Sequence, residues 1–169
     1  MKKIINCKHI FAALIFVSAP YEALASSWYT TNVGNNDTSY YFDAESVSRT
    51  KDTMLVWVKT VQNYTVDTDG SWATAYRWKF NCARKTIQTM ASSTYDKDGK
   101  FIKSNTNPSG ETEVIPDSTG EGMLRLACAA DFPKNKSEKE YVKIADNDVF
   151  EATRRYVQYV KSKVDTAPK

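Results

Sequence analysis

Alternation between large apolar and polar side chains predicts the strands of this chain. Residues 76–82 read YRWKFNC, so every second side chain points to the same face of an extended segment. The residues on the predicted core face of this strand are Tyr76, Trp78, Phe80 and Cys82. Residues 54–61 (MLVWVKTV) are rich in β-branched and aromatic residues, which favour a pleated, half-buried surface. Both segments are therefore predicted to be strands of one sheet.

Shorter patterns complete an antiparallel sheet of about six strands. The additional strands are predicted at residues 28–33, 40–42, 85–95 and 101–105. Residues 67–70 and 96–99 each place Asp-Gly between two strands, which favours a tight hairpin because glycine accepts a positive φ. A calcium loop is the alternative for these turns. The spacing disfavours it, since glycine comes fourth rather than sixth and no glutamate follows at the twelfth position.

Two helices are predicted in the C-terminal half. Ser118 and Glu121 form a capping box before a short helix that ends at Cys128 and is apolar on most sides, so it should be buried. Its apolar residues are Met123, Leu124, Leu126, Ala127 and Ala130. A second helix, residues 148–164, carries an apolar stripe and is expected to pack on its own domain. A membrane-surface or partner-binding helix would show the same stripe.

The first 25 residues have the three parts of a secretory signal peptide. A lysine-rich start is followed by an apolar run at residues 10–17 and by Ala23-Leu24-Ala25. A membrane anchor is the alternative, but the run is shorter than the roughly 20 residues that span a bilayer. We expect an exported protein in which residues 26–130 form a β domain. The polar tract and helix of residues 131–169 are expected to pack on this domain.

Export changes which side chains remain for chemistry. The only histidine, His9, lies in the signal segment, which excludes histidine-dependent hydrolases and imidazole metal sites from the mature chain. Cys82 and Cys128 remain, and an even pair in an oxidising compartment predicts a disulfide. Closing a loop of about 45 residues should stabilise the fold by about 4 kcal/mol.

Catalysis is not expected. Glu111 and Glu113 are two residues apart in a loop and could serve a small carboxylate-dependent hydrolase, but solvated surface is the commoner role of such a pair. The sequence shows no phosphate loop, so we expect no cofactor. Removing residues 1–25, with three lysines and one glutamate, lowers the formal net charge from +3 to +1. That charge argues against binding to nucleic acid.

Binding is the better supported activity, and a few residues are candidates for it. Trp72 follows a predicted turn, where an aromatic ring either folds over the sheet or anchors a ligand. The terminal Lys169 places a carboxylate beside an ammonium, the zwitterion that lysine-binding kringle modules accept. The other candidates are lysines of two clusters that are either solvated surface or contacts to acidic partners. They are Lys97, Lys100, Lys103, Lys134 and Lys136, and Lys139 lies in the same cluster as the last two.

Several motifs resemble the surface-adhesin protein E family of Gram-negative bacteria. They are YYFDAESVSR at residues 40–49, LVWVKT at 55–60, YRWKFNCARKTI at 76–87, YDKDGKFI at 95–102 and IPDSTGEGMLRLAC at 115–128. The resemblance implies an antiparallel sheet with helical cover in a secreted or surface-exposed, non-enzymatic domain. It also implies binding to host matrix or serum proteins.

These observations together predict an α+β protein that binds another protein at or near the cell surface. A periplasmic accessory or inhibitor protein with a bacterial partner is the alternative, and a carboxylate-dependent hydrolase is third. The sequence leaves open whether the chain forms a homodimer.

Overall fold

The computed structural model describes residues 26–31, 38–63, 67–130, 132, 141–144 and 148–165. The signal segment and three of the candidate binding residues, Lys134, Lys136 and Lys169, lie outside these residues, as does Lys139.

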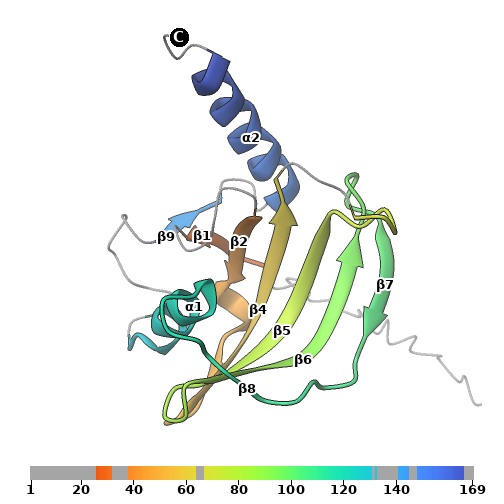
Figure 1. The fold of residues 1–169 in the computed structure, drawn as a ribbon. Helices are drawn as coiled ribbons and strands as arrows, with labels where there is room; N and C mark the ends of the chain where they lie inside the picture. Colours follow the sequence, from red (N-terminus) through yellow and green to blue (C-terminus); the bar gives the residue numbers. More distant parts are fainter. Residues whose placement is uncertain are drawn as a thin grey trace, which may run out of the picture.

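One antiparallel sheet organises the described residues (Figure 1). Its six longer strands are β1 (Trp28–Thr31), β2 (Thr38–Asp43), β4 (Thr53–Gln62), β5 (Ala73–Asn81), β6 (Thr86–Tyr95) and β7 (Phe101–Asn105). Three short strands, which the alternation pattern did not predict, are β3 (Ser48–Arg49), β8 (Thr112–Glu113) and β9 (Tyr141–Lys143). Two or three residues are too few for a recognisable alternation. The main strand order is β7-β6-β5-β4-β2-β1-β9, with β3 paired to β4 and β8 paired to β6.

The first face of the sheet holds the larger core. The register pairs Met54 with Phe80 and Val56 with Trp78, so these side chains share one face. Met54, Val56 and Phe80 are fully buried. The predicted core row is thus confirmed for Phe80. Trp78 and Tyr76 are only half buried, and their rings stack with centroids 5.2 Å apart.

Helix α1 (Thr119–Cys128) covers this first face. The Ser118 hydroxyl accepts from Glu121 N, while the Glu121 carboxylate accepts from Asp117 N rather than from Ser118. The helix buries the expected side chains Met123, Leu124, Leu126 and Ala127. Ala130 was predicted to join them, but it follows the end of the helix and is exposed.

The Cys82–Cys128 disulfide is confirmed. It joins the residue after β5 to the last residue of α1, with the two Cα atoms 5.7 Å apart. Arg49 reinforces the same end of α1, because its Nη2 donates to the carbonyl oxygens of Ala127 and Ala129 at 2.7 and 2.9 Å. A cation that caps these carbonyls also complements the helix dipole. The end of α1 is therefore fixed by a covalent bond and a charged cap.

The second face of the sheet is also covered. Its buried cluster is Trp28, Tyr41, Val61, Trp72, Ala73, Ile144 and Val149. Val61 and Ala73 are directly paired, and both point away from the Met54–Phe80 side. Trp57 is partly buried and lies at the border of this second cluster. The sheet therefore has two apolar faces.

Helix α2 (Val149–Asp165) contacts the second face through its first turns. Val149 and Thr153 are buried, and the Thr153 hydroxyl lies 2.7 Å from the hydroxyl of Tyr41. Farther along the helix Tyr156 is 41% exposed and Tyr159 is 60% exposed. Figure 1 shows the later turns of α2 extending beyond the sheet. Within the described part of the chain, no helix combines the length and apolarity needed to cross a membrane.

Candidate functional site

Two hairpin turns lie side by side at one end of the sheet. The β4–β5 turn closes through Gly70 N donating to Asp67 O at 2.8 Å, and Gly70 has φ +80°. The β6–β7 turn closes through Gly99 N donating to Asp96 O at 3.0 Å, and Gly99 has φ +78°. Both glycines adopt a conformation that other residues reach only with strain. The predicted short hairpin is thus confirmed between β6 and β7. The turn at 67–70 also forms, but it lies within a longer connection, because β4 ends at Gln62 and β5 begins at Ala73.

The first turns of α2 lie against the β6–β7 turn. Arg154 Nη1 donates to the carbonyl oxygen of Lys97 at 3.2 Å. A Cβ placed on Gly99 would lie 3.4 Å from Cε2 of Phe150, which shows how closely the helix approaches the turn. We define the hairpin end as the surface formed by turns 67–71 and 96–100 together with residues 148–155, at the start of α2.

The three candidate lysines of the β6–β7 hairpin differ in their surroundings. Lys103 forms an ion pair with Asp69 of the neighbouring hairpin. The hydrogen bond from Lys103 lowers the pKa of the Asp69 carboxyl, and the same bond raises the pKa of Lys103. The Lys97 and Lys100 side chains are exposed and form no ion pair with any residue that the structure describes.

The hairpin end has mixed charge rather than the purely basic character of a lysine cluster. Acidic residues occupy both turns, and the Asp96 carboxylate accepts from the backbone N–H groups of Asp98 and Lys100 at 2.9 and 2.8 Å. Asp69 likewise accepts from Ser71 N at 3.0 Å. Asp69 and Asp96 are thus held by their own turns, whereas Lys97, Lys100 and the neighbouring Asp98 have exposed side chains. Lys97 and Lys100 are the exposed cations of this turn that can pair with a ligand.

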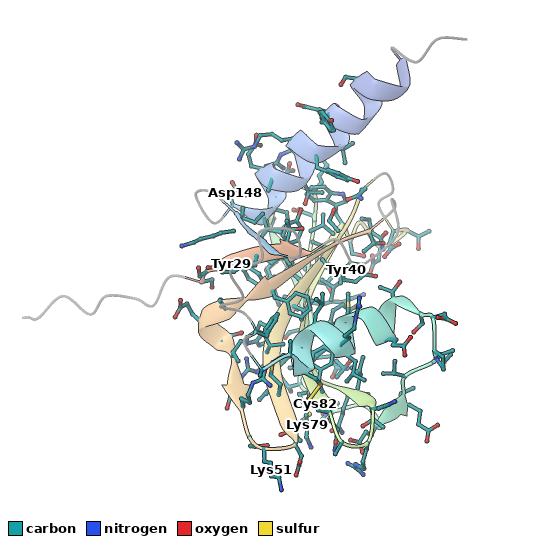
Figure 2. All side chains as sticks on the ribbon, turned by 90° about the vertical axis from the view of Figure 1, so that its left-hand side faces the viewer. Tyr29, Tyr40, Lys51, Lys79, Cys82 and Asp148 are labelled. Atoms are coloured by element: carbon teal, nitrogen blue, oxygen red, sulfur yellow. A yellow bond between two sulfur atoms is a disulfide. The ribbon has the colours of Figure 1, made fainter. Side chains whose placement is uncertain are left out.

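An aromatic cage around Lys59 attaches α2 to the sheet. Its Nζ lies 4.8 Å from the ring centroid of Trp28, 5.4 Å from that of Tyr95 and 4.8 Å from that of Phe150. Desolvation by burial lowers the pKa of Lys59, while the nearby Asp148 carboxylate opposes this shift. Three rings from three elements around one cation favour the docked position of the helix. Figure 2 shows Asp148 at the start of α2.

Trp72 is packed rather than projecting. Only 9% of it is exposed, and its ring lies 5.7 Å from that of Phe150. It lines a pocket of about 240 Å³ together with Asn63, Arg154, Val157 and Gln158. Trp72 can therefore contact a ligand only through this small pocket.

The candidate carboxylates Glu111 and Glu113 are not buried together in a cleft. Glu111 is held by Arg84, with Nη2 2.6 Å from Oε2, and it also accepts from the Thr86 hydroxyl at 2.7 Å. Glu113 lies in β8 and is exposed. A larger groove of about 630 Å³ runs beside the disulfide, and it is lined by Lys85, Asp117, Ser118, Glu121 and Arg125 among others. No buried polar side-chain atom lacks a hydrogen bond in the described residues, and they contain no cluster of metal-ligating side chains.

Sequence reasoning missed Lys59, Phe150 and Arg154 as parts of this end of the molecule. Lys59 interrupts an apolar strand, which was the one available signal of an unusual cation. Phe150 and Arg154 gave no signal, because they are distant in sequence from the hairpins that they contact.

The architecture defines the class of protein. It is an α+β domain with one antiparallel sheet, a helix joined to the first face by a disulfide and a second helix docked on the other face. The model of the surface-adhesin protein E family matches residues 28–129, and the chain belongs to this family. The match ends before β9 and α2, so the helix side of the hairpin end lies outside the family domain. Comparison with curated proteins gave no match.

Proposed function

We propose that this chain is an exported, non-enzymatic adhesin that binds a host matrix or serum protein through its hairpin end. Membership of a surface-adhesin family supports a surface location and a binding role. The alternative of a periplasmic protein with a bacterial partner predicts the same fold but a different location, so location is tested separately below.

The exposed pair Lys97 and Lys100 carries the proposal. Most charged groups around these lysines are engaged: Lys103 with Asp69, and Asp96 with its own turn. Lys97 and Lys100 are therefore two unpaired cations that can attract an acidic ligand. Because Arg154 of α2 donates to the Lys97 carbonyl oxygen, the hairpin is held in place and should lose little backbone freedom when a ligand binds.

Binding of the purified protein to immobilised matrix and serum proteins tests this site. Reversing both charges (Lys97→Glu with Lys100→Glu) should weaken binding by about tenfold or more, mainly through a slower association rate that depends on ionic strength. The matched control reverses Lys51 and Lys85, exposed lysines in turns at the opposite end of the sheet. Figure 2 shows Lys51 far from Asp148. Equal losses in the two double variants would contradict a site at the hairpin end.

Protease treatment of intact cells tests the location. A surface adhesin should be cleaved, whereas a periplasmic accessory protein should be protected until the outer membrane is opened. Lys134, Lys136 and Lys169 remain proposed secondary contacts. Neutralising the first two, or deleting Lys169, should lower binding if they contribute, and deletion of Lys169 should act specifically on kringle-containing ligands.

A further inference from the structure

Strand β7 forms an open edge of the sheet. It pairs with β6 on one side, and among the described residues no strand pairs with its other side, as Figure 1 shows. The rest of the β6 edge is covered. β8 pairs with Thr86 and Ile87, and Ser109 exchanges hydrogen bonds with the backbone of Thr89. The outer side of β7 is therefore where a further strand can add to this edge.

The register shows which backbone groups of β7 point outward. Trp72 N donates to Tyr95 O, so the backbone of Tyr95 faces β5. Backbone direction alternates along a strand, so Ser93 also faces β5 and not β7. Ser104 lies directly opposite Ser93, and facing residues of an antiparallel pair either both point inward or both point outward. The N–H and C=O of Ser104 therefore point away from the sheet.

The side chains along this edge indicate what kind of strand would fit. Phe101 is 55% exposed and Ile102 is 37% exposed, although both lie in a strand. Residues 100–107 contain two lysines and no acidic residue. The register with β6 skips Ile102, so β7 is irregular at this exposed apolar pair. An incoming segment that carries both apolar and acidic side chains would cover exposed surface of Phe101 and pair with Lys100.

We propose that the β7 edge receives an extended acidic segment of the protein ligand as an additional antiparallel strand. This inference rests on the proposed function and specifies how the ligand binds beside the hairpin end. Backbone hydrogen bonds would supply affinity, and the exposed Lys100 would select acidic sequences, since Lys103 is already paired with Asp69.

A second copy of the chain would bring the same basic edge with it. Residues 100–107 contain two lysines and no acidic residue, so two β7 edges would place like charges along the new pairing, which is destabilising. Charge thus favours an acidic strand of a different chain over a dimer through β7.

Substitution of Ser104 separates backbone from side-chain recognition. Ser104→Pro removes the outward N–H, and proline is tolerated on an edge strand where that group faces solvent. Ser104→Ala keeps the N–H and is the matched control. The probe is the peptide acetyl-Glu-Val-Glu-Val-Glu-Val-amide, measured by titration calorimetry against the full chain. We expect Ser104→Pro to weaken peptide binding about five- to tenfold and Ser104→Ala to leave it unchanged.

Hydrogen exchange of the same complex gives an independent result. Bound peptide should slow exchange of the Ser104 amide, and N-methylation of alternate peptide amides should abolish binding although the side chains are kept. Absence of peptide binding, or equal affinity of the proline and alanine variants, would overturn the inference. The proposed function would survive that outcome if matrix or serum proteins still bound through Lys97 and Lys100. If matrix and serum proteins failed to bind while the peptide still bound at β7, the proposed function would be refuted but strand addition at β7 would not.

Discussion

Loss of the disulfide should remove a large part of the stability of this domain. The perturbation is replacement of both Cys82 and Cys128 by serine, with Cys7 also replaced in variant and reference so that no third thiol can exchange. The bond closes a loop with a sequence separation of 46 residues. Fixing a loop of that length lowers the entropy of the unfolded chain, which is worth about 4 kcal/mol at 25 °C.

The folded state of this variant should remain close to the wild type. Cys82 and Cys128 are only partly buried, so serine in their place keeps some access to water. Met123 and Ala127 of α1 stay buried, and Arg49 still caps the helix carbonyls. We therefore assign most of the expected loss to the unfolded chain rather than to a rearranged helix.

Urea unfolding followed by tryptophan fluorescence and by circular dichroism measures the effect. The double variant should lose about 4 kcal/mol of unfolding free energy. Its m-value should rise because the unfolded chain, without the crosslink, exposes more surface. A loss below about 1 kcal/mol with an unchanged m-value would refute the reasoning. Such a result would show that contacts of α1 that persist in the unfolded chain already restrict it as much as the disulfide does.

Three further predictions concern the second face and the hairpin end. Burial holds the pKa of Lys59 below its ordinary 10.5. The unfolded chain therefore binds more protons between the two values, and wild-type stability should rise with pH in that window relative to Lys59→Met. If the unfolding free energies of wild type and Lys59→Met, measured with urea, changed in parallel with pH, this prediction would be contradicted. Thr153→Val should cost about 1–3 kcal/mol, since the buried Tyr41 hydroxyl loses its partner. It should also raise the pKa of Tyr41 further, as read by ultraviolet titration, because the bond to Thr153 lowers it. Gly99→Ala should destabilise by about 1 kcal/mol or more, because φ is positive and its Cβ would crowd a ring of α2. Gly70→Ala has the same φ problem but open space, so equal losses in thermal unfolding would exclude the crowding effect.

The confirmed strand predictions share a physical basis. In 54–58 buried and less buried side chains alternate, so the local pattern and the final burial agree. In 76–82 the strand itself is as predicted, but its burial does not alternate, since Phe80 and Asn81 are buried and the other side chains are only partly buried. The Asp-Gly turns were equally local, because glycine is required wherever φ must be positive. The β5 residues that form the second core face were not predicted. Ala73 and Ala75 are small enough to be buried on either face, so their direction could not be predicted from composition.

The candidate site was less accessible to sequence reasoning. The Lys97, Lys100 and Lys103 cluster was visible, but its three members look alike until Asp69 pairs with only one of them. The neighbouring carboxylates were also visible. Their engagement by backbone N–H groups depends on the exact turn geometry, which the sequence does not specify.

The sequence by itself determined the elements whose causes lie within a few residues: the long strands, the glycine turns, the capped helix α1 and the pair of cysteines available for a disulfide. Only the tertiary structure decided that α2 docks on the second face, that Lys59 is enclosed by three rings and that β7 is an open edge. These features depend on contacts between residues far apart in the chain. Such contacts leave no local periodicity, because their free energy arises only when separate elements are brought together and water is excluded between them.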